Sequence, residues 1–243
     1  MPCKNAGPYL EECITSVQNQ NWTNWELIVI DDASTDNSQD ILKSFAAKDA
    51  RISVHNNDGE GIVPALEKGF VLSNGEWIHR MDADDVMPEN KLETLYHHIN
   101  GRKDVVVTGR VKYFADCEIS EGYQGYEKWL NELTKHEVMS VNRYRECVVA
   151  SPNWLVHRSC FEDKIKIDEL RYPEDFDMTL KWFKYGYQIV KSPQVTHLWR
   201  EHPKRTSRTS ENYQQAAFFK MKVKHWLDDI FQTNTKVNVI GNN

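Results

Sequence analysis

Short apolar runs alternate along the chain with segments whose apolar residues recur every three or four positions. Residues 25–30 form a run rich in β-branched side chains, which predicts a buried strand, and residues 8–20 show the helical spacing. Further strands are expected over residues 52–54, 76–81, 104–111, 151–157, 188–190 and 195–199. Further helices are expected over residues 37–48, 63–72, 91–99, 125–146, 173–185 and 211–231.

This alternation of strands and helices is typical of an α/β fold. A mostly parallel central sheet would be covered by helices on both faces, and a helical extension would follow at the C-terminus. No internal repeat or Pro/Gly/Ser-rich linker divides the chain, which favours one domain. Residues 236–243 are expected to form a strand that enters a turn.

Acidic residues follow two of the predicted strands at the point where each strand ends. Asp31 and Asp32 come directly after the first apolar run, and Asp82, Asp84 and Asp85 come after the strand expected over 76–81. In parallel α/β sheets, ligands bind outside the carboxyl ends of the strands. Both acidic clusters are therefore expected to line one crevice.

Three carboxylates within four residues repel one another unless a cation offsets their charge. A divalent cation such as Mg2+ or Mn2+, which prefers oxygen ligands, would do so. The alternative is a helix start, with Asp84 or Asp85 as the N-cap and Pro88 in the first turn. That alternative accounts for one acid and leaves two without a role.

Two further polar segments lie in the second half of the chain. Glu174 and Asp175 open the helix expected over 173–185, where acids also suit the helix dipole, so a purely structural role is an open alternative. Residues 200–208 form a basic, glycine-free loop that suits either phosphate contact or simple solvation.

Composition excludes several classes of protein. The 243 residues carry a net charge of -6 with a pI near 5.9, which argues against a nucleic-acid-binding protein. Five cysteines form no CxxC pair, so we expect reduced thiols and no zinc site. No apolar run has the length of a membrane span or a signal peptide. We therefore expect a soluble cytoplasmic protein, with a place at the inner face of the membrane left open.

With these features the chain resembles the family-two glycosyltransferases of the GT-A (Rossmann-like) fold, from residue 1 to about 210. A lone DxD motif is weak evidence, but four segments match in the right order. They are residues 2–5 with the helix containing 16–20, the strand and turn over 26–36, the DxD region over 75–85, and Pro-Glu-Asp at 173–175.

The resemblance implies a nucleotide-sugar-dependent, inverting transferase. Asp32, with Asp31 beside it, would bind the uracil or ribose of a UDP-sugar. Asp82 and Asp84 would hold the ribose edge and an Mn2+ or Mg2+ ion that bridges the diphosphate. Asp175 would be the general base that deprotonates the acceptor hydroxyl.

The resemblance also assigns lesser roles. His202 matches a late histidine that reaches the metal or diphosphate in related enzymes, although a histidine in such a position is otherwise usually a surface residue. Arginines would neutralise phosphate charge, and the opening segment would contact the donor. These expected donor contacts are Pro2, Asn5, Arg80, Arg200 and Arg205.

The same resemblance divides the chain. Residues 1–112 would bind the nucleotide sugar, 113–210 would bind the acceptor, and 211–243 would form the C-terminal helix and tail. Family members have an apolar first strand before the Pro-x-x-Asn segment, whereas this sequence begins with only its end. Either the start is placed late or the chain is trimmed, which would leave Asn5 poorly anchored.

The acceptor is not fixed by these motifs. A glycan or lipid-linked acceptor in surface-polysaccharide synthesis is expected, without DNA. Tyr126, Trp129 and Asn131 with residues 152–154 resemble a subgroup that also contains enzymes that glycosylate a modified tRNA base.

Two other kinds of protein would also fit. A non-catalytic glycan- or nucleotide-sugar-binding protein could keep the same fold. A nucleotidyltransferase would likewise need paired carboxylates, but the chain lacks a Gly-rich, Lys-containing phosphate loop, since Gly59-Glu60-Gly61 is too short. Slow hydrolysis of a donor would separate a transferase from a binding protein.

Overall fold

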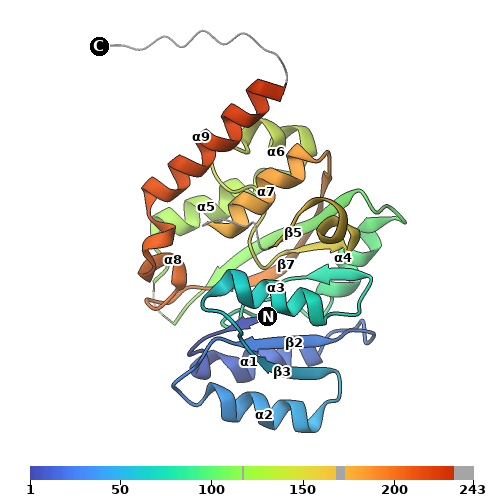
Figure 1. The fold of residues 1–243 in the computed structure, drawn as a ribbon, viewed down its shortest axis with the longest axis vertical. Coiled ribbons are helices and arrows are strands. Elements are labelled where there is room, and N and C mark those ends of the chain that lie inside the picture. The colour runs from blue at the N-terminus through green and yellow to red at the C-terminus, as the bar shows by residue number, and fades with distance from the viewer. Residues whose placement is uncertain (117, 168–172, 233–243) are drawn as a thin grey trace.

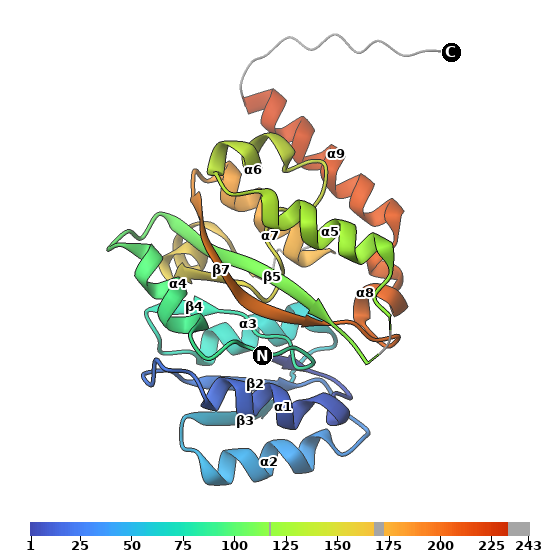
Figure 2. The ribbon, with the colours of Figure 1, turned by 180° about the vertical axis from the view of Figure 1, so that it is seen from behind.

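The computed structural model describes residues 1–116, 118–167 and 173–232, so the strand expected over 236–243 lies outside the described residues. Strands and helices alternate through the first half, as Figures 1 and 2 show. The strands are β1 (Pro2–Cys3), β2 (Leu27–Asp31), β3 (Ile52–Asn56), β4 (Trp77–His79), β5 (Val105–Phe114), β6 (Trp154–His157) and β7 (Gln188–Arg200). The helices are α1 (Gly7–Gln18), α2 (Ser38–Lys48), α3 (Ile62–Leu72), α4 (Lys91–Ile99), α5 (Glu121–Glu132), α6 (His136–Asn142), α7 (Glu174–Lys184), α8 (Thr206–Thr209) and α9 (Gln215–Gln232), with a π-helix η1 (Cys160–Lys164) and a 3-10 helix η2 (Glu211–Tyr213).

The first sheet is parallel and has the order β1-β2-β3. Cys3 lies opposite Asp31, and Asp31 lies opposite Asn56, so the three strands end at the same edge. Helix α1 packs on α2, whereas α3 packs on β1 and β2. The polar residues that follow these three strands all lie at this edge of the sheet. The edge therefore forms one wall of a cleft.

The second sheet is mixed and has the order β4-β6-β5-β7. Strand β6 runs antiparallel to both β4 and β5, whereas the long strands β5 and β7 are parallel. The expected α/β fold with parallel strands is confirmed, with β6 as the antiparallel exception. The main hydrophobic core lies between this sheet and the helices of the second half.

Two segments differ from the sequence-based expectation. The two strands expected over 188–190 and 195–199 are one strand, β7. Pro193 has no N–H to donate to the neighbouring strand, and a shift in the pairing register opposite Thr108–Arg110 accommodates it. The amphipathic helices expected over 125–146 are α5 and α6. The expected helix 211–231 begins only at Gln215, after α8 and η2. Within the described residues, no helix has both the length and the apolar composition needed to cross a bilayer.

Candidate active site

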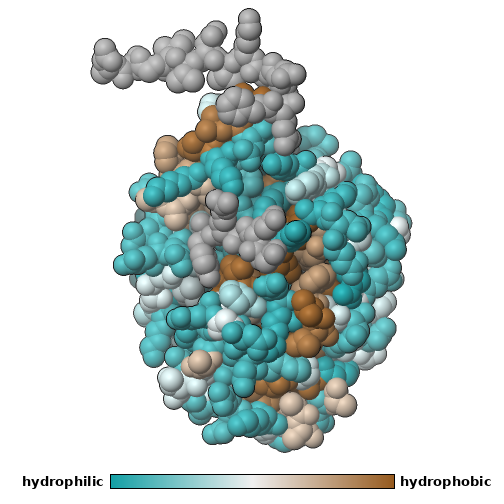
Figure 3. Space-filling model, viewed as in Figure 1, coloured by the Kyte–Doolittle hydropathy of each residue, from teal (hydrophilic) through white to brown (hydrophobic). Residues whose placement is uncertain are grey.

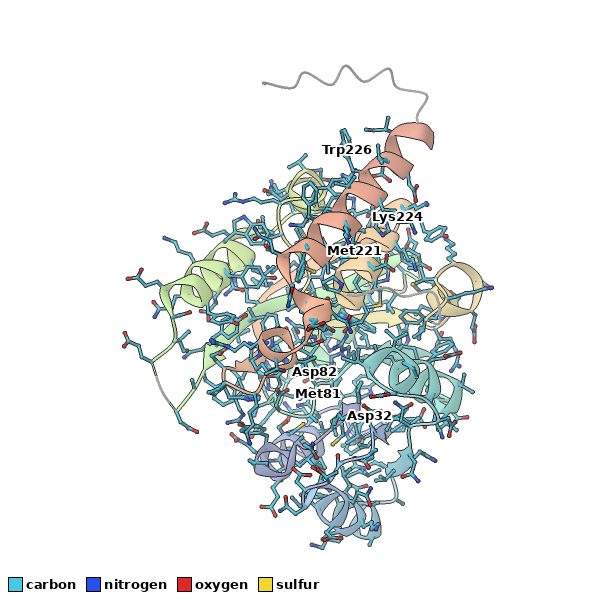
Figure 4. All side chains as sticks on the ribbon, turned by 60° about the vertical axis from the view of Figure 1, so that its left-hand side comes forward. Asp32, Met81, Asp82, Met221, Lys224 and Trp226 are labelled. Carbon is cyan, nitrogen blue, oxygen red and sulfur yellow. The ribbon has the colours of Figure 1, made fainter. Side chains whose placement is uncertain are left out.

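A cavity of about 1270 Å3 lies between the ends of β1, β2 and β4 on one side and α7 with the segment after β7 on the other. In Figure 4, Asp32 and Asp82 lie on the strand side of this region. Most of the residues expected in the site line it, whereas Asp31 and Arg200 are not among the lining residues. The expected residues that do line it are Pro2, Asn5, Asp32, Arg80, Asp82, Asp84, Asp175, His202 and Arg205.

The carboxylate of Asp32 is held by three internal donors. Nζ of Lys4 lies 3.0 Å from Oδ2, Nδ2 of Asn57 donates to Oδ1 at 2.7 Å, and the backbone N–H of Gly61 reaches both oxygens at 3.1 and 3.2 Å. Burial opposes the charge, but these hydrogen bonds outweigh it and lower the pKa of Asp32 below its usual value. Asp32 is therefore an ionised acceptor at the cavity wall. Gly61 adopts φ 90, a conformation that glycine tolerates, where the chain enters α3.

Asp31 supports the loop behind Asp32. Its Oδ2 accepts a hydrogen bond from Nε2 of Gln39 at 2.8 Å, and its side chain is buried. Asn5 completes this support, since its N–H donates to Oγ of Ser34 at 2.9 Å and its Oδ1 accepts from the N–H of Thr35 at 2.8 Å. Asn5 is thus anchored to the loop after β2, and its φ of 50 is a left-handed conformation that asparagine tolerates.

Arg80 joins the end of β4 to the start of α7. Its Nε donates to Oδ1 of Asp82 at 2.8 Å, and its Nη1 donates to Oε1 of Glu174 at 2.8 Å. Arg80 and Glu174 are buried, and burial disfavours the guanidinium charge. The two carboxylates more than offset this, so the pKa of Arg80 lies well above its usual value. The hydroxyl of Tyr213 donates to the other oxygen of Glu174, which extends the network to η2.

Asp175 stands beside this network at the first turn of α7. Its Oδ1 accepts a hydrogen bond from the N–H of Phe176 at 2.8 Å. Burial, with the charge of Glu174 beside it, raises the pKa of Asp175 to about 7, although Arg80 acts in the opposite direction. A carboxylate that titrates near neutral pH has the basicity that suits a general base.

Asp84 and His202 meet across the cavity. Nε2 of His202 lies 2.8 Å from Oδ2 of Asp84, and the His202 ring packs on Tyr9 with a centroid separation of 4.5 Å. Within residues 1–116, 118–167 and 173–232, no three Asp, Glu, His or Cys side chains form a ready-made metal cluster. A carboxylate and an imidazole directed at one point nevertheless suit Mn2+ or Mg2+ if substrate phosphate oxygens and water fill the remaining positions. Asp82 lies near this pair but is engaged by Arg80.

Asp85 is a buried structural residue and does not cap a helix. Helix α4 begins at Lys91, and Asp85 is buried below the cavity, where its Oδ2 lies 3.0 Å from Nε2 of His197. Nδ1 of His197 lies 3.0 Å from Nζ of Lys91, which also donates to the carbonyl of Pro152. Burial lowers the pKa of Lys91 to about 7 and raises that of Asp85. This chain of groups fixes the acidic loop from behind, and the expected capping role is wrong.

The two late arginines divide in function. Arg200 lies behind the acidic loop, where its Nε donates to the carbonyl of Asp84 at 2.7 Å and its N–H donates to Oδ1 of Asp85 at 2.8 Å. Arg205 lines the cavity, pairs with Glu201 at 3.0 Å, and lies over the ring of Trp199 at 5.0 Å. Arg205 is thus placed to meet an anion in the cavity, whereas Arg200 positions the backbone of the acidic loop.

Sequence reasoning missed three groups of cavity residues. Lys4 and Gly61 bind Asp32. The short Gly59-Glu60-Gly61 segment was the one sequence feature that drew attention to Gly61, and no sequence feature pointed to Lys4. Tyr213 binds Glu174 from a segment expected to be plain helix. Aromatic side chains cover another part of the cavity wall. Those that line the cavity are Tyr113, Tyr123, Tyr126, Trp199 and Phe218.

Comparison with known proteins yields consistent matches. The family model described as Glycosyl transferase family 2 matches residues 1–164. Glycosyltransferase GlyG of Streptococcus pneumoniae is 33% identical over 143 residues, which are 58% of this chain and 48% of GlyG. The putative colanic acid biosynthesis glycosyl transferase WcaA of Escherichia coli is 25% identical over 250 residues, covering 92% of this chain and 87% of WcaA. The chain spans about half the length of the first curated relatives that it matches.

A solved structure shares the fold. The structure of S. aureus TarS 1-349 in complex with UDP-GlcNAc superposes with a TM-score of 0.69, covering 95% of this chain and 71% of that TarS 1-349 chain at 17% identity. At that identity the likeness describes the fold, which is the GT-A arrangement expected from the sequence.

Proposed function

This chain belongs to glycosyl transferase family 2, and on that basis we propose that it moves a sugar from a nucleotide sugar to a hydroxyl group of a glycan or lipid-linked acceptor. Asp32, Asp84 and Asp175 come from three separated segments and line one cavity. This convergence is the observation that supports a transferase most strongly. The relative WcaA, described as a putative colanic acid biosynthesis glycosyl transferase, favours cell-surface polysaccharide as the product.

The donor side of the cavity is the wall formed by residues after β1, β2 and β4. Asp32 would accept a hydrogen bond from the base or ribose, with Pro2 and Asn5 shaping the same wall and Asp31 supporting it from behind. A UDP-sugar is the proposed donor, which accords with the UDP-GlcNAc bound by the structural neighbour TarS. Arg205 would meet the diphosphate, because it lines the cavity on the side that faces the acidic loop.

The metal site would use Asp84 and His202, with Asp82 at its edge. Mn2+ or Mg2+, when bound there, supplies Lewis-acid stabilisation of the charge that develops on the departing diphosphate. Through its two ion pairs, Arg80 holds Asp82 and the first turn of α7 in fixed positions relative to each other. Arg200 keeps the backbone of Asp84 in place.

Asp175 would act on the acceptor. As the acceptor oxygen attacks the anomeric carbon, its proton passes to the carboxylate of Asp175, and the bond from the anomeric carbon to the diphosphate breaks. The nucleoside diphosphate leaves with the bonding electrons. One displacement of this kind inverts the anomeric centre. The pKa of about 7 means that a substantial fraction of Asp175 is ionised at neutral pH.

Calorimetry with a panel of UDP-sugars, with Mn2+ and with EDTA, tests donor binding, and release of nucleoside diphosphate tests turnover. We expect binding that EDTA weakens, and slow donor hydrolysis without acceptor. Asp175→Asn should keep donor binding and lose transfer, whereas the exposed Asp40→Asn on α2 should leave both unchanged. Donor binding without any hydrolysis or transfer would indicate a binding protein, and no donor binding would overturn the proposal.

A further inference from the structure

The outer face of α9 carries three exposed large apolar side chains. Phe219, Trp226 and Leu227 are exposed by 67%, 40% and 39%, and they recur at the seven- and eight-residue spacing that places side chains on one face of a helix. Met221 and His225 lie on the opposite face and are buried, with His225 held by Asp177 at 2.7 Å. Brown atoms follow the course of α9 along the upper left edge of Figure 3. An apolar face of this kind needs a covering surface.

The charges around this face are positive. Lys220 and Lys224 are exposed on α9, and no acid occurs between residues 215 and 227. The first acids, Asp228 and Asp229, interact with residues of neighbouring helices: Asp228 with Lys184, and Asp229 with Arg143. A chain with a net charge of -6 thus presents lysines beside its exposed aromatic residues.

We propose that the outer face of α9 docks on a bilayer that contains anionic lipids. An amphipathic helix with aromatic side chains on its apolar face and lysines at the border lies in the plane of the lipid headgroups. The lysine stems cover apolar surface while their ammonium groups reach the phosphates. Charge complementarity favours this occupant over a second copy of the chain, because the lysines of two copies would repel one another.

The first turn of α9 lies at the cavity, so docking of α9 on a bilayer would affect how the cavity is placed relative to lipids. Phe218, in the first turn of α9, and Tyr213, just before it, both line the cavity. In Figure 4, Asp32 and Asp82 lie beyond the N-terminal end of α9, whereas Lys224 and Trp226 lie farther along the helix. Helix α6, tied to α9 through the Arg143–Asp229 pair, adds the exposed Val141 to the same end of the molecule. Because the first turn of α9 lines the cavity, a bilayer bound along α9 would lie beside the cavity, which, on the proposed function, suits a lipid-linked acceptor.

Co-sedimentation of the full chain with phosphatidylcholine vesicles, with and without phosphatidylglycerol, tests docking directly. We expect binding to vesicles with phosphatidylglycerol and little to phosphatidylcholine alone. The double variant Phe219→Glu/Trp226→Glu should lower binding by about tenfold or more. Val71→Glu, at an apolar residue of α3 that is 72% exposed, should have no effect.

The charge contribution has its own variants. Lys220→Glu/Lys224→Glu should lower binding by about tenfold or more, because each basic residue near an anionic surface adds to the attraction. Lys43→Glu/Lys48→Glu makes the same change of charge at exposed positions of α2 and should have no effect. Circular dichroism and slow donor hydrolysis, unchanged in all variants, exclude misfolding.

Three outcomes would overturn the proposal. In the first, wild-type protein binds neither kind of vesicle. In the second, Phe219→Glu/Trp226→Glu protein binds vesicles as well as wild type does. In the third, wild-type protein binds no vesicles and sediments as a dimer, and the same double variant sediments as a monomer. Loss of vesicle binding with donor hydrolysis retained bears on docking alone, whereas absence of hydrolysis in wild type bears on the proposed function alone.

Discussion

Arg80 and Glu174 are 94 positions apart in the sequence, yet their side chains meet at 2.8 Å in a pair from which water is almost fully excluded. The pair joins the acidic loop after β4 to the helix that carries Asp175. This buried ion pair therefore helps to hold the acidic loop and α7, on the two sides of the cavity, in place relative to each other.

Glu174→Gln tests that dependence. The substitution leaves the Arg80 guanidinium with one carboxylate fewer in a buried site, and we expect the free energy of unfolding to fall by about 3 kcal/mol or more. Denaturant unfolding measures it. Arg102→Ala, which breaks the exposed Arg102–Asp104 pair at 2.9 Å, is the control and should cost less than about 1 kcal/mol. Equal effects would show that the buried pair has no special weight.

The raised pKa of Asp175 predicts the pH dependence of transfer. The base acts when ionised, so the rate should rise with pH through about 7 and then level off. Initial rates of nucleoside diphosphate release at saturating substrate measure this profile. A rate already level at pH 5 would mean that Asp175 titrates near the usual value for an aspartate.

The same shift predicts an effect on stability with the opposite direction. A carboxyl group whose pKa is higher in the folded state binds more protons there, so wild type loses stability as pH rises from about 4 to about 7. Asp175→Asn removes this loss and should be more stable than wild type at pH 8, with the gain shrinking toward pH 4. Urea unfolding at both pH values measures it, and Asp40→Asn should show no such dependence.

Asp84 and His202 should determine metal affinity together. In the presence of nucleoside diphosphate, His202→Ala should weaken Mn2+ binding by about tenfold and Asp84→Asn by at least as much, since each removes one of the two proposed protein ligands. Calorimetric titration of Mn2+ checks both. His97→Ala, at an exposed histidine of α4, should leave the affinity unchanged. Full affinity in His202→Ala would remove the histidine from the metal site.

Two glycines should respond in opposite ways to substitution by alanine. A Cβ on Gly109 would lie 2.2 Å from Oγ1 of the buried Thr196, which donates to Asn153, so Gly109→Ala should lower the melting temperature markedly. Gly125 in α5 has nothing within 4 Å of such a Cβ, and Gly125→Ala should raise the free energy of unfolding by up to about 1 kcal/mol. Differential scanning calorimetry compares them, and similar shifts would contradict the close packing of β5 on β7.

The sequence predicted the alternation of elements and the gathering of acids at the strand ends because both depend on local patterns. Asp32 and Asp84 each follow an apolar run that forms a strand, and ligands bind outside the carboxyl ends of strands in α/β folds. The sequence did not show that β2 and β4 belong to two different sheets. The cavity position of Asp175 was expected from the resemblance alone. The other features depend on distant partners. Nothing near Asp85 in the sequence indicates His197, and nothing near Pro193 indicates that β5 keeps β7 continuous past it.

Under the proposed function, the internal hydrogen-bond partners of Asp32 bear on nucleotide selectivity. Lys4, Asn57 and Gly61 already satisfy the carboxylate, so a ligand that reaches it exchanges one hydrogen bond for another. A site rejects an analogue strongly when the analogue leaves a buried polar group without a partner. Here a ligand that lacks the matching donor leaves no such group, because the protein's own donors stay in place. On the proposed role of Asp32, discrimination between bases by this carboxylate alone would be weak, and selectivity would come from the shape of the wall around it.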